Sequence, residues 1–310
     1  MTATVVIVSK NRCNDLRKAI ASCLSQTAKP QIIVVDDAST DQTASMVLRE
    51  FPEVGFIRHE ESRGCVLRRN EAAALASFDV IFSIDDDAEF STPHVVEQAL
   101  ADFSESRIGA LSIPLIEPRK GGEVQNRPPD DRDIWVSDTF IGTAYAVRRQ
   151  CFLKVGGFRG DLIHQGEETD FCIRLLDSGF VVRLSNADPI IHHESPFRDL
   201  DRMHYFGRRN DLLFAANNVP AELAVLHMLA TTVNGLRAAM SATERGAMLR
   251  GIGDGWWHAL RALGGRCPVR RETYQLFRQL RTSGALTFSE VAPRLADSMP
   301  RGRAPDRQDR

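Results

Sequence analysis

The sequence predicts an α/β fold with a mostly parallel central sheet, helices on both faces of the sheet, and a helical extension at its C-terminal end. Short β-branched apolar runs alternate with segments of helical periodicity through the first 85 residues, as they do when parallel strands are joined by helices. Polar residues stand at the point where three of these runs end. From Asp199 onward, the apolar residues recur at helical spacing alone.

The first half of the chain contains four predicted strands with helices between them. Each strand is a short apolar run of the kind that is buried on both faces: 4–8, 31–35, 54–57 and 79–84. Asn14 is a suitable N-cap for the helix that follows the first strand. Another helix is expected over 65–77, with Leu67, Ala74 and Leu75 on its buried face.

The second half mixes shorter elements with a long irregular segment. Pro93 suits the first turn of a helix, and Gly156-Gly157 close a later one. Segment 114–133 is rich in Pro, Gly and charge and is expected to form a loop. Strands are expected at 108–113, 135–147, 181–184 and 190–191. The C-terminal helices are expected at about 201–217, 220–240, 243–263 and 270–282.

Length and composition are those of a soluble globular protein: 310 residues, 43% hydrophobic and 26% charged. The six cysteines form no CxxC pair, so neither a zinc site nor a disulfide framework is indicated. The N-terminus lacks the basic start of a signal peptide, and no apolar stretch is expected to reach the roughly 18–20 residues of a membrane span. We expect a cytoplasmic protein, with peripheral contact to the inner face of the membrane as the open alternative.

The C-terminal part is basic. Residues 237–310 contain 14 Arg against 7 Asp and Glu, whereas the rest of the chain is acidic overall. Such a segment suggests an anionic partner, such as a membrane surface, and Trp next to Arg on its helices suits a membrane interface. A helical subdomain packed on the body, with a solubilising charged end, is the alternative. No nucleic-acid partner is expected.

Asp85, Asp86 and Asp87 follow the fourth predicted strand directly. Crowded carboxylates raise one another's pKa, so three in a row at a strand end suggest a cation that holds them there. Hard divalent ions such as Mg²⁺ or Mn²⁺ take oxygen ligands of this kind. Taken alone, the cluster fits a solvated acidic turn equally well.

Several stretches stand in a recognisable order along the chain. They are Val5–Arg12, Val34–Asp41, Arg69–Ala72, Asp85–Asp87, Arg148–Phe158, Gly166–Asp170 and Arg208–Asn210. Together they resemble the family 2 glycosyltransferases, whose GT-A fold has a Rossmann-like sheet flanked by helices. The resemblance implies a catalytic domain over 1–215, with nucleotide-sugar binding in about 1–115 and the acceptor half in about 116–215. A helical extension over 216–285 and a disordered tail over 286–310 complete the expected layout.

The resemblance also implies which side chains hold the donor. Asp37, with Asp36 and Ser39 beside it, matches the family's contact to the pyrimidine base or ribose, although such residues also cap helices. Asp85 would contact the ribose. Arg69 would help to cradle the nucleotide, unless it faces solvent. Further donor contacts are implied for Val8, Ser9, Asn11, Arg12, Asn70, Asp86 and Arg209.

Metal and catalytic roles follow from the same resemblance. Asp87 would bind the metal that bridges the diphosphate, together with His192 or His193 after the last strand. Glu168 is the predicted general base and Glu167 the second choice, because a base must take the proton of the acceptor hydroxyl. A helix start favours the ionised carboxylate through the helix dipole, although an acidic first turn is also the ordinary use of such residues. Asp170 is expected to position the acceptor.

The chain departs from the family pattern in two places. The first strand commonly ends in Pro-Thr-Tyr-Asn, whereas here it ends in Val8-Ser9-Lys10-Asn11, so no aromatic ring is present to stack on the base. Lys10 could approach a phosphate instead. The family usually shows Glu-Asp where this chain has Glu167-Glu168, which lengthens the predicted base by one methylene.

The implied function is inverting transfer of a sugar from a UDP- or dTDP-linked donor to a hydroxyl of a glycan or lipid-linked acceptor, in cell-surface polysaccharide synthesis. The implied cofactor is Mg²⁺ or Mn²⁺. A nucleotidyltransferase is a second possibility, but it would favour a Gly-rich phosphate loop, which Ser9–Arg12 does not provide. A catalytically silent binding module is a third, and the carboxylates and His192 count against it.

Overall fold

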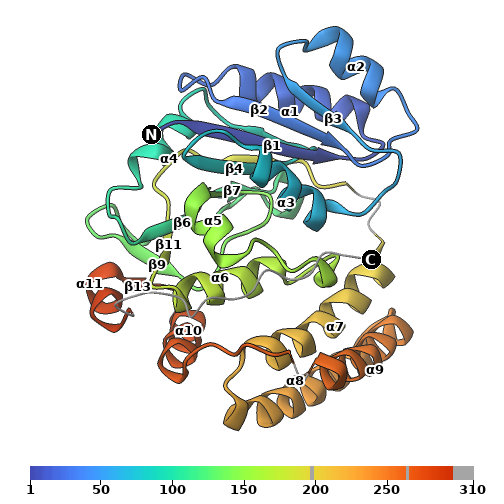
Figure 1. Ribbon diagram of the computed structural model, residues 1–310, viewed down its shortest axis with the longest axis vertical. Coiled ribbons are helices and arrows are strands. Elements are labelled where there is room, and N and C mark those ends of the chain that lie inside the picture. The colour runs from blue at the N-terminus through green and yellow to red at the C-terminus, as the bar shows by residue number, and fades with distance from the viewer. Residues whose placement is uncertain (196–198, 263–264, 296–310) are drawn as a thin grey trace.

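The computed structural model describes residues 1–195, 199–262 and 265–295. The described residues form a central sheet with helices on both sides and a group of C-terminal helices, drawn in yellow to red in Figure 1. The predicted α/β fold with its C-terminal helical extension is therefore confirmed.

The central sheet has nine strands in the order β13-β9-β11-β6-β10-β4-β1-β2-β3. They are β1 (Ala3–Ser9), β2 (Gln31–Asp36), β3 (Gly55–Arg58), β4 (Val80–Asp85), β6 (Ile108–Ser112), β9 (Trp135–Ser137), β10 (Tyr145–Arg148), β11 (Val181–Leu184) and β13 (Leu286–Thr287). The block β3-β2-β1-β4 is parallel throughout. Beyond it the sheet is mixed, because β10 lies antiparallel between β4 and β6.

The strand order reverses at β1. The chain moves outward from β1 through β2 to β3, then returns to place β4 on the other side of β1. In register, Val8 lies beside Asp85 and Ser9 beside Asp36, so the polar ends of three strands meet at one edge of the sheet. A crevice at such a reversal point is where ligands bind in parallel α/β sheets.

Alternation along β1 divides the core in two. Val5 and Ile7 join one apolar cluster, and Val6 joins the other, on the opposite face. The first face is covered by α1 (Cys13–Leu24), α2 (Thr43–Glu50) and α4 (Val95–Ala101). The second is covered by α3 (Cys65–Leu75), α5 (Arg149–Val155) and α6 (Glu167–Asp177).

The buried face predicted for α3 is wrong. Ala74 and Leu75 are exposed, and the helix instead buries Val66 and a pair of arginines, Arg68 and Arg69, with two alanines. The arginines turn inward because carboxylates at the ends of β2 and β4 pair with them. Hydrophobic periodicity could not reveal a helix face that is held by ion pairs.

A second, four-stranded sheet has the order β5-β12-β7-β8. Its strands are β5 (Ala88–Phe90), β12 (Ile190–His192), β7 (Leu115–Ile116) and β8 (Val124–Gln125). β12 pairs with β5 so that His192 lies opposite Ala88. This pairing brings a histidine that is about a hundred residues distant in the chain next to the aspartate cluster.

The C-terminal helices are α7 (Leu200–Asn218), α8 (Ala221–Ser241), α9 (Arg245–Ala262), α10 (Arg271–Ser283) and α11 (Phe288–Val291). The four long ones match the four predicted helices within two residues at each end. α8 is long and apolar enough to cross a membrane by length and composition, which corrects the expectation that no segment reaches that length.

The expectation of disorder from residue 286 onward is wrong for its first part. Leu286 and Thr287 form β13, which pairs with β9 at the edge of the central sheet. The side chains of Thr287 and Glu290 then form a capping box at the start of α11. The rest of that expectation falls on 296–310, which lies outside the described residues.

Candidate active site

A cleft of about 830 Å³ opens at the carboxyl ends of β1 and β4. Its size is within the usual range for small-molecule sites, roughly 300–1,000 Å³. The predicted site residues that line it are Val8, Ser9, Arg12, Asp37, Arg69, Asp85, Asp86, Asp87, Glu167, Glu168 and His192. The predicted site residues outside its lining are Asn11, Asp36, Ser39, Asn70, Asp170, His193 and Arg209.

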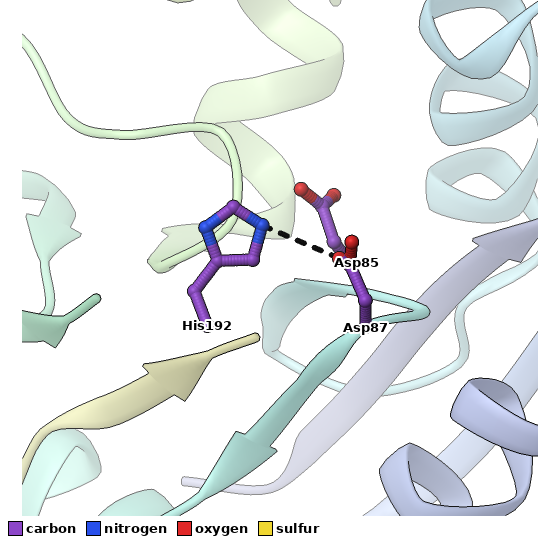
Figure 2. Close-up of side chains that lie close together, drawn as sticks. All are labelled: Asp85, Asp87 and His192. Carbon is purple, nitrogen blue, oxygen red and sulfur yellow. Dashed lines mark ion pairs between the residues drawn. The ribbon is translucent and has the colours of Figure 1, made fainter. Parts of the chain in front are cut away.

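Asp85, Asp87 and His192 form a group that could hold a divalent cation. One possible ligand atom from each lies within 4.8 Å of the others, and Figure 2 shows the His192 ring facing Asp87, with Nε2 3.3 Å from Oδ1. The other ring nitrogen, Nδ1, is 3.2 Å from Glu117 Oε1, the kind of outer partner that orients a ligating histidine. The two carboxylates suit Mg²⁺ or Mn²⁺, and the imidazole favours the transition metal Mn²⁺ of these two.

The three aspartates occupy three different environments. Burial opposes ionisation of Asp87, but the hydrogen bond with His192 and the charge of Arg12 outweigh it and lower the pKa of Asp87 to about 2. Asp86 accepts a hydrogen bond from Ser9 Oγ at 2.7 Å, and burial raises its pKa to about 7. Asp87 is thus the strongly anionic member, whereas Asp86 turns back toward β1.

Arg69 joins the aspartate cluster to the pair of glutamates at the start of α6. Its Nη2 donates to Asp85 Oδ1 at 2.6 Å, and its Nη1 lies 3.5 Å from Glu167 Oε1. Thr143 donates to the other oxygen of Asp85. The Arg69 side chain is buried, so the alternative that it faces solvent is excluded, and it sets the distance between two acidic groups of the cleft.

Glu167 and Glu168 begin α6 after Gly166, whose φ of 83° is in the left-handed region. Glu167 is buried, and Glu168 lies half-buried in the wall of the cleft. Desolvation first, and then the neighbouring charge of Glu167, raise the pKa of Glu168 to about 8. A carboxylate with a raised pKa is the stronger base, as proton abstraction requires.

Gly142 is a site residue that the sequence did not reveal. A Cβ at this position would overlap Glu168 Oε1 and crowd the Arg69 guanidinium. The loop that carries Gly142 is held by Phe140, whose ring stacks on Tyr145 with the centroids 4.3 Å apart. The sequence placed this loop in a strand-like segment, and a lone glycine there gave no functional signal.

We expect Gly142→Ala to slow transfer about a hundredfold, because the methyl group pushes the Glu168 carboxylate away and a misplacement of about 1 Å costs that much. The backbone at Gly142 is not left-handed, so alanine adds no backbone strain, and any fall in the thermal unfolding midpoint comes from moving the Glu168 carboxylate and the Arg69 guanidinium. Gly246→Ala on α9 is the matched control, since nothing lies within 4 Å of its added Cβ. Equal turnover of the two variants would show that Gly142 does not position Glu168.

Asp37 lines the cleft, but its carboxylate already has partners. Oδ1 accepts from the Arg63 backbone N–H and from Arg68 Nε, and Oδ2 accepts from Ser62 Oγ and the Gly64 backbone N–H. Burial alone would raise the pKa of Asp37, but these hydrogen bonds outweigh it and lower that pKa to about 2. Asp37 therefore shapes the loop before α3, and a base N–H could reach it only by displacing one of these donors.

Three other predicted donor residues tie the ends of β1 and β2 together. Asp36 Oδ1 accepts from the Ser39 backbone N–H, Ser39 Oγ from the Asn11 backbone N–H, and Asn11 Oδ1 from the Thr40 backbone N–H. These side chains therefore hydrogen-bond to the loops beside the cleft. They hold the ends of β1 and β2 in place and do not line the cleft themselves.

Asp170 does not reach the cleft. Its buried carboxylate pairs with Arg174 at 2.7 Å and Arg159 at 3.0 Å, and it accepts from Asn218 Nδ2 at 2.6 Å. The expectation that Asp170 positions the acceptor is therefore replaced by a structural role. Glu168 and Asp170 point in different directions from the first turn of α6, and only Glu168 lines the cleft.

Three further predicted site residues also have other partners. Asn70 bonds to both backbone groups of Phe158, and Arg209 donates to the backbone carbonyl of Asp161, in a short 3-10 helix before α6. His193 turns outward to Glu89, 2.7 Å from Nε2, because successive residues at a strand end point to opposite sides. His192, and not His193, belongs to the candidate metal group.

The cleft also contains residues that sequence reasoning missed. Glu117 and Lys120 come from the segment expected to be a loop, and Arg202 and Met203 come from the first turn of α7. Lys120 Nζ pairs with Glu117 Oε1 at 3.1 Å, beside the ring of His192. Charged residues in a Pro- and Gly-rich segment are ordinary surface composition, so the sequence gave no signal for them.

The model of the family described as "Glycosyl transferase family 2" matches residues 4–160, half of the chain. One curated relative is the succinoglycan biosynthesis protein ExoU of Rhizobium meliloti, 27% identical over 196 residues, which are 56% of this chain and 57% of that protein. Another is the pre-mycofactocin glycosyltransferase of Mycobacterium tuberculosis, 26% identical over 66% of this chain and 46% of its own length. The chain thus spans about half the length of these relatives.

Solved structures share the fold at lower identity. A mannosyltransferase from Pyrobaculum calidifontis, in complex with GDP-Man and Mn²⁺, superposes with a TM-score of 0.58 at 18% identity, over 91% of this chain and 82% of its own. TarS 1-349 of S. aureus in complex with UDP-GlcNAc gives 0.58 at 17% identity, over 91% and 88%. These likenesses confirm the predicted GT-A fold, and the family match over half of the chain shows that the protein belongs to glycosyl transferase family 2.

Proposed function

We propose that the protein is an inverting glycosyltransferase that moves a sugar from a nucleoside-diphosphate donor, UDP- or dTDP-linked, to a hydroxyl of a glycan or lipid-linked acceptor. The observation that carries the proposal is that Glu168 faces the same cleft as the Asp85, Asp87 and His192 group. A base and a cation site in one cleft are what direct displacement at an anomeric carbon needs.

The candidate ligands Asp85, Asp87 and His192 would hold Mg²⁺ or Mn²⁺, and the mannosyltransferase complex solved with Mn²⁺ supports this assignment. A divalent ion bound there would act as a Lewis acid that neutralises charge on the leaving diphosphate. Glu117 would orient His192 through its Nδ1.

The chain's own residues supply the rest of the reaction. Glu168 takes the proton of the acceptor hydroxyl while the hydroxyl oxygen forms its bond to the anomeric carbon. The bond between that carbon and the diphosphate oxygen breaks, and the electron pair leaves with the diphosphate. Arg12 and Lys10 bring positive charge to the same end of the cleft, suited to phosphate oxygens.

The acceptor class and setting rest on the relatives. ExoU and an O-antigen biosynthesis protein of Myxococcus xanthus support a role in cell-surface polysaccharide synthesis. A glucosyl-dolichyl phosphate glucuronosyltransferase of Haloferax volcanii, 24% identical over 63% of this chain, supports a lipid-linked acceptor. We place the enzyme on the cytoplasmic side of the membrane, where nucleotide sugars are supplied.

Calorimetric titration with UDP, dTDP and GDP, each with and without Mn²⁺, tests the proposal. We expect one of the pyrimidine nucleotides to bind more tightly when Mn²⁺ is present. A screen of sugars on that nucleotide for metal-dependent release of the diphosphate would then identify the donor. Failure of all three nucleotides to bind in the presence of Mn²⁺ would overturn the proposal, and binding of GDP alone would overturn the choice of a UDP- or dTDP-linked donor.

The pH dependence of transfer should report Glu168. Since the base must be ionised, its raised pKa means that kcat falls as the pH drops through about 8, the apparent value belonging to the glutamate pair. Glu167→Gln removes the neighbouring charge, so the acidic limb of the profile should move to lower pH. The measurement is kcat against pH at saturating donor and metal. An acidic limb that does not move would show that the charge of Glu167 does not influence the pKa of the base.

A further inference from the structure

α8 turns its large apolar side chains outward. Val225, Leu226, Leu229, Val233, Leu236 and Met240 are each at least 44% exposed. At 3.6 residues per turn these six positions fall within an arc of about 100°. The stripe runs from Val225 to Met240 on this helix, which is roughly 23 Å along the helix axis.

The inward side of α8 is built from smaller residues. Apart from Met228, its buried positions are Ala224, Gly235 and Ala239. Gly235 lets α9 approach closely, since a Cβ there would lie 3.0 Å from Ile252 Cδ1. A surface helix of a water-soluble protein has the reverse arrangement, with its larger apolar residues toward the core.

The apolar stripe, meaning these six outward residues of α8, continues onto α9 and is bordered by arginines. A groove of about 420 Å³ near the end of α8 is lined by Val233, Leu236, Ala239, Met240 and Leu249, with Arg237 and Arg245 at its edge. On α9, exposed Trp257 carries the Arg261 guanidinium 4.4 Å from its ring centroid. Arg237 has no ion-pair partner within the described ranges.

The acidic residues of α9 and its N-terminal turn face away from the stripe. Asp254 accepts from the Tyr205 hydroxyl at 2.7 Å, and Glu244 pairs with His204, so both point to α7. Glu222, the acidic side chain of α8, falls in the same arc one turn before Val225, so the N-terminal end of the stripe carries one negative charge. From Val225 onward the outer surface of the two helices is apolar with arginines at its border, and Figure 1 shows both helices at the edge of the molecule farthest from β2 and β3.

We propose that the apolar stripe of α8 is a membrane-docking surface that lies in the plane of an anionic lipid leaflet. The apolar side chains would enter the acyl boundary, while Trp257 and the arginines meet the headgroups. A second copy of the chain would cover apolar area equally well, but the arginine border would then meet arginines. The proposal deepens the proposed function, because it names the surface that would bring a lipid-linked acceptor near the cleft.

Vesicle flotation of the full chain tests the surface without any transfer reaction. We expect the protein to float with phosphatidylcholine vesicles that contain phosphatidylglycerol and to remain below with phosphatidylcholine alone. Leu226→Gln with Met240→Gln should weaken binding at least about tenfold, because two large apolar side chains no longer insert. The matched control is Leu48→Gln with Leu75→Gln, two exposed leucines on α2 and α3, which should float as the parent does.

Four results would count against docking of α8 in the plane of the membrane. No flotation, or equal loss in both double variants, would overturn the proposal, as would a dimer in light scattering that the Leu226 and Met240 changes dissolve. Binding that resists both high salt and alkaline extraction would indicate a spanning helix and overturn docking in the plane. Because nucleotide titration does not involve α8, it can succeed while flotation fails, or the reverse, and the two proposals are tested separately.

Discussion

Replacing Glu168 with glutamine is expected to lower kcat by about 10²–10⁴-fold, the usual contribution of a positioned general base. The glutamine keeps the volume of the side chain and its hydrogen-bonding reach, but it cannot take a proton from the acceptor hydroxyl. The pKa of Glu168 is raised, and its half-buried side chain lines the cleft. Loss of its carboxylate should therefore change the chemistry and leave the fold intact. The measurement is single-turnover transfer at saturating donor and metal.

Donor binding should survive the same change. Glu168 makes no hydrogen bond with the aspartate cluster in the described part of the chain, whereas Glu167 approaches it through Arg69. Titration of Glu168→Gln with the nucleotide and Mn²⁺ should therefore match the parent, and Glu167→Gln serves as the neighbouring control that retains a base. Near-parental turnover of Glu168→Gln would remove it as the base and leave Glu167 as the candidate.

Local sequence signals were sufficient for the strand ends. A buried apolar run that stops at Asp85 or Asp36 predicts a strand. Because parallel strands run in one direction, the run also predicts the edge of the sheet at which its polar end lies. The fold and the place of the cleft follow from that pattern. The C-terminal helices could also be predicted from the sequence, since 3.6-residue periodicity persists through each of them.

The direction in which an individual side chain points could not be predicted from the sequence. His192 and His193 are adjacent, yet one faces Asp87 and the other Glu89, and the choice is made by the pairing of β12 with β5, distant in the chain. Asp170 stands in the motif that was expected to position the acceptor, but its carboxylate is paired with Arg159 and Arg174. Such assignments depend on contacts that no local pattern encodes.

Loss of the Asp87 carboxylate is expected to abolish both transfer and the effect of Mn²⁺ on nucleotide binding. Mutating an outer partner of a ligand typically costs 10–100-fold in metal affinity, so deleting a ligand itself should exceed about a hundredfold. Asp87→Ala also leaves Arg12 and His192 without the carboxylate that pairs with both. Asp87→Asn, which keeps the side-chain volume and can still hydrogen-bond, separates loss of the ligand from loss of packing.

Titration of each variant with Mn²⁺, followed by nucleotide, measures the effect apart from catalysis. His193→Ala is the matched control, because this neighbouring histidine turns to Glu89 at the surface and should keep parental metal affinity, whereas His192→Ala should follow Asp87→Ala. If both Asp87 variants bind nucleotide more tightly with Mn²⁺, as the parent is expected to, the cation lies elsewhere. Asp87 would then be the counter-charge of Arg12, and the acidic end of β4 would serve to hold a guanidinium in place of a metal.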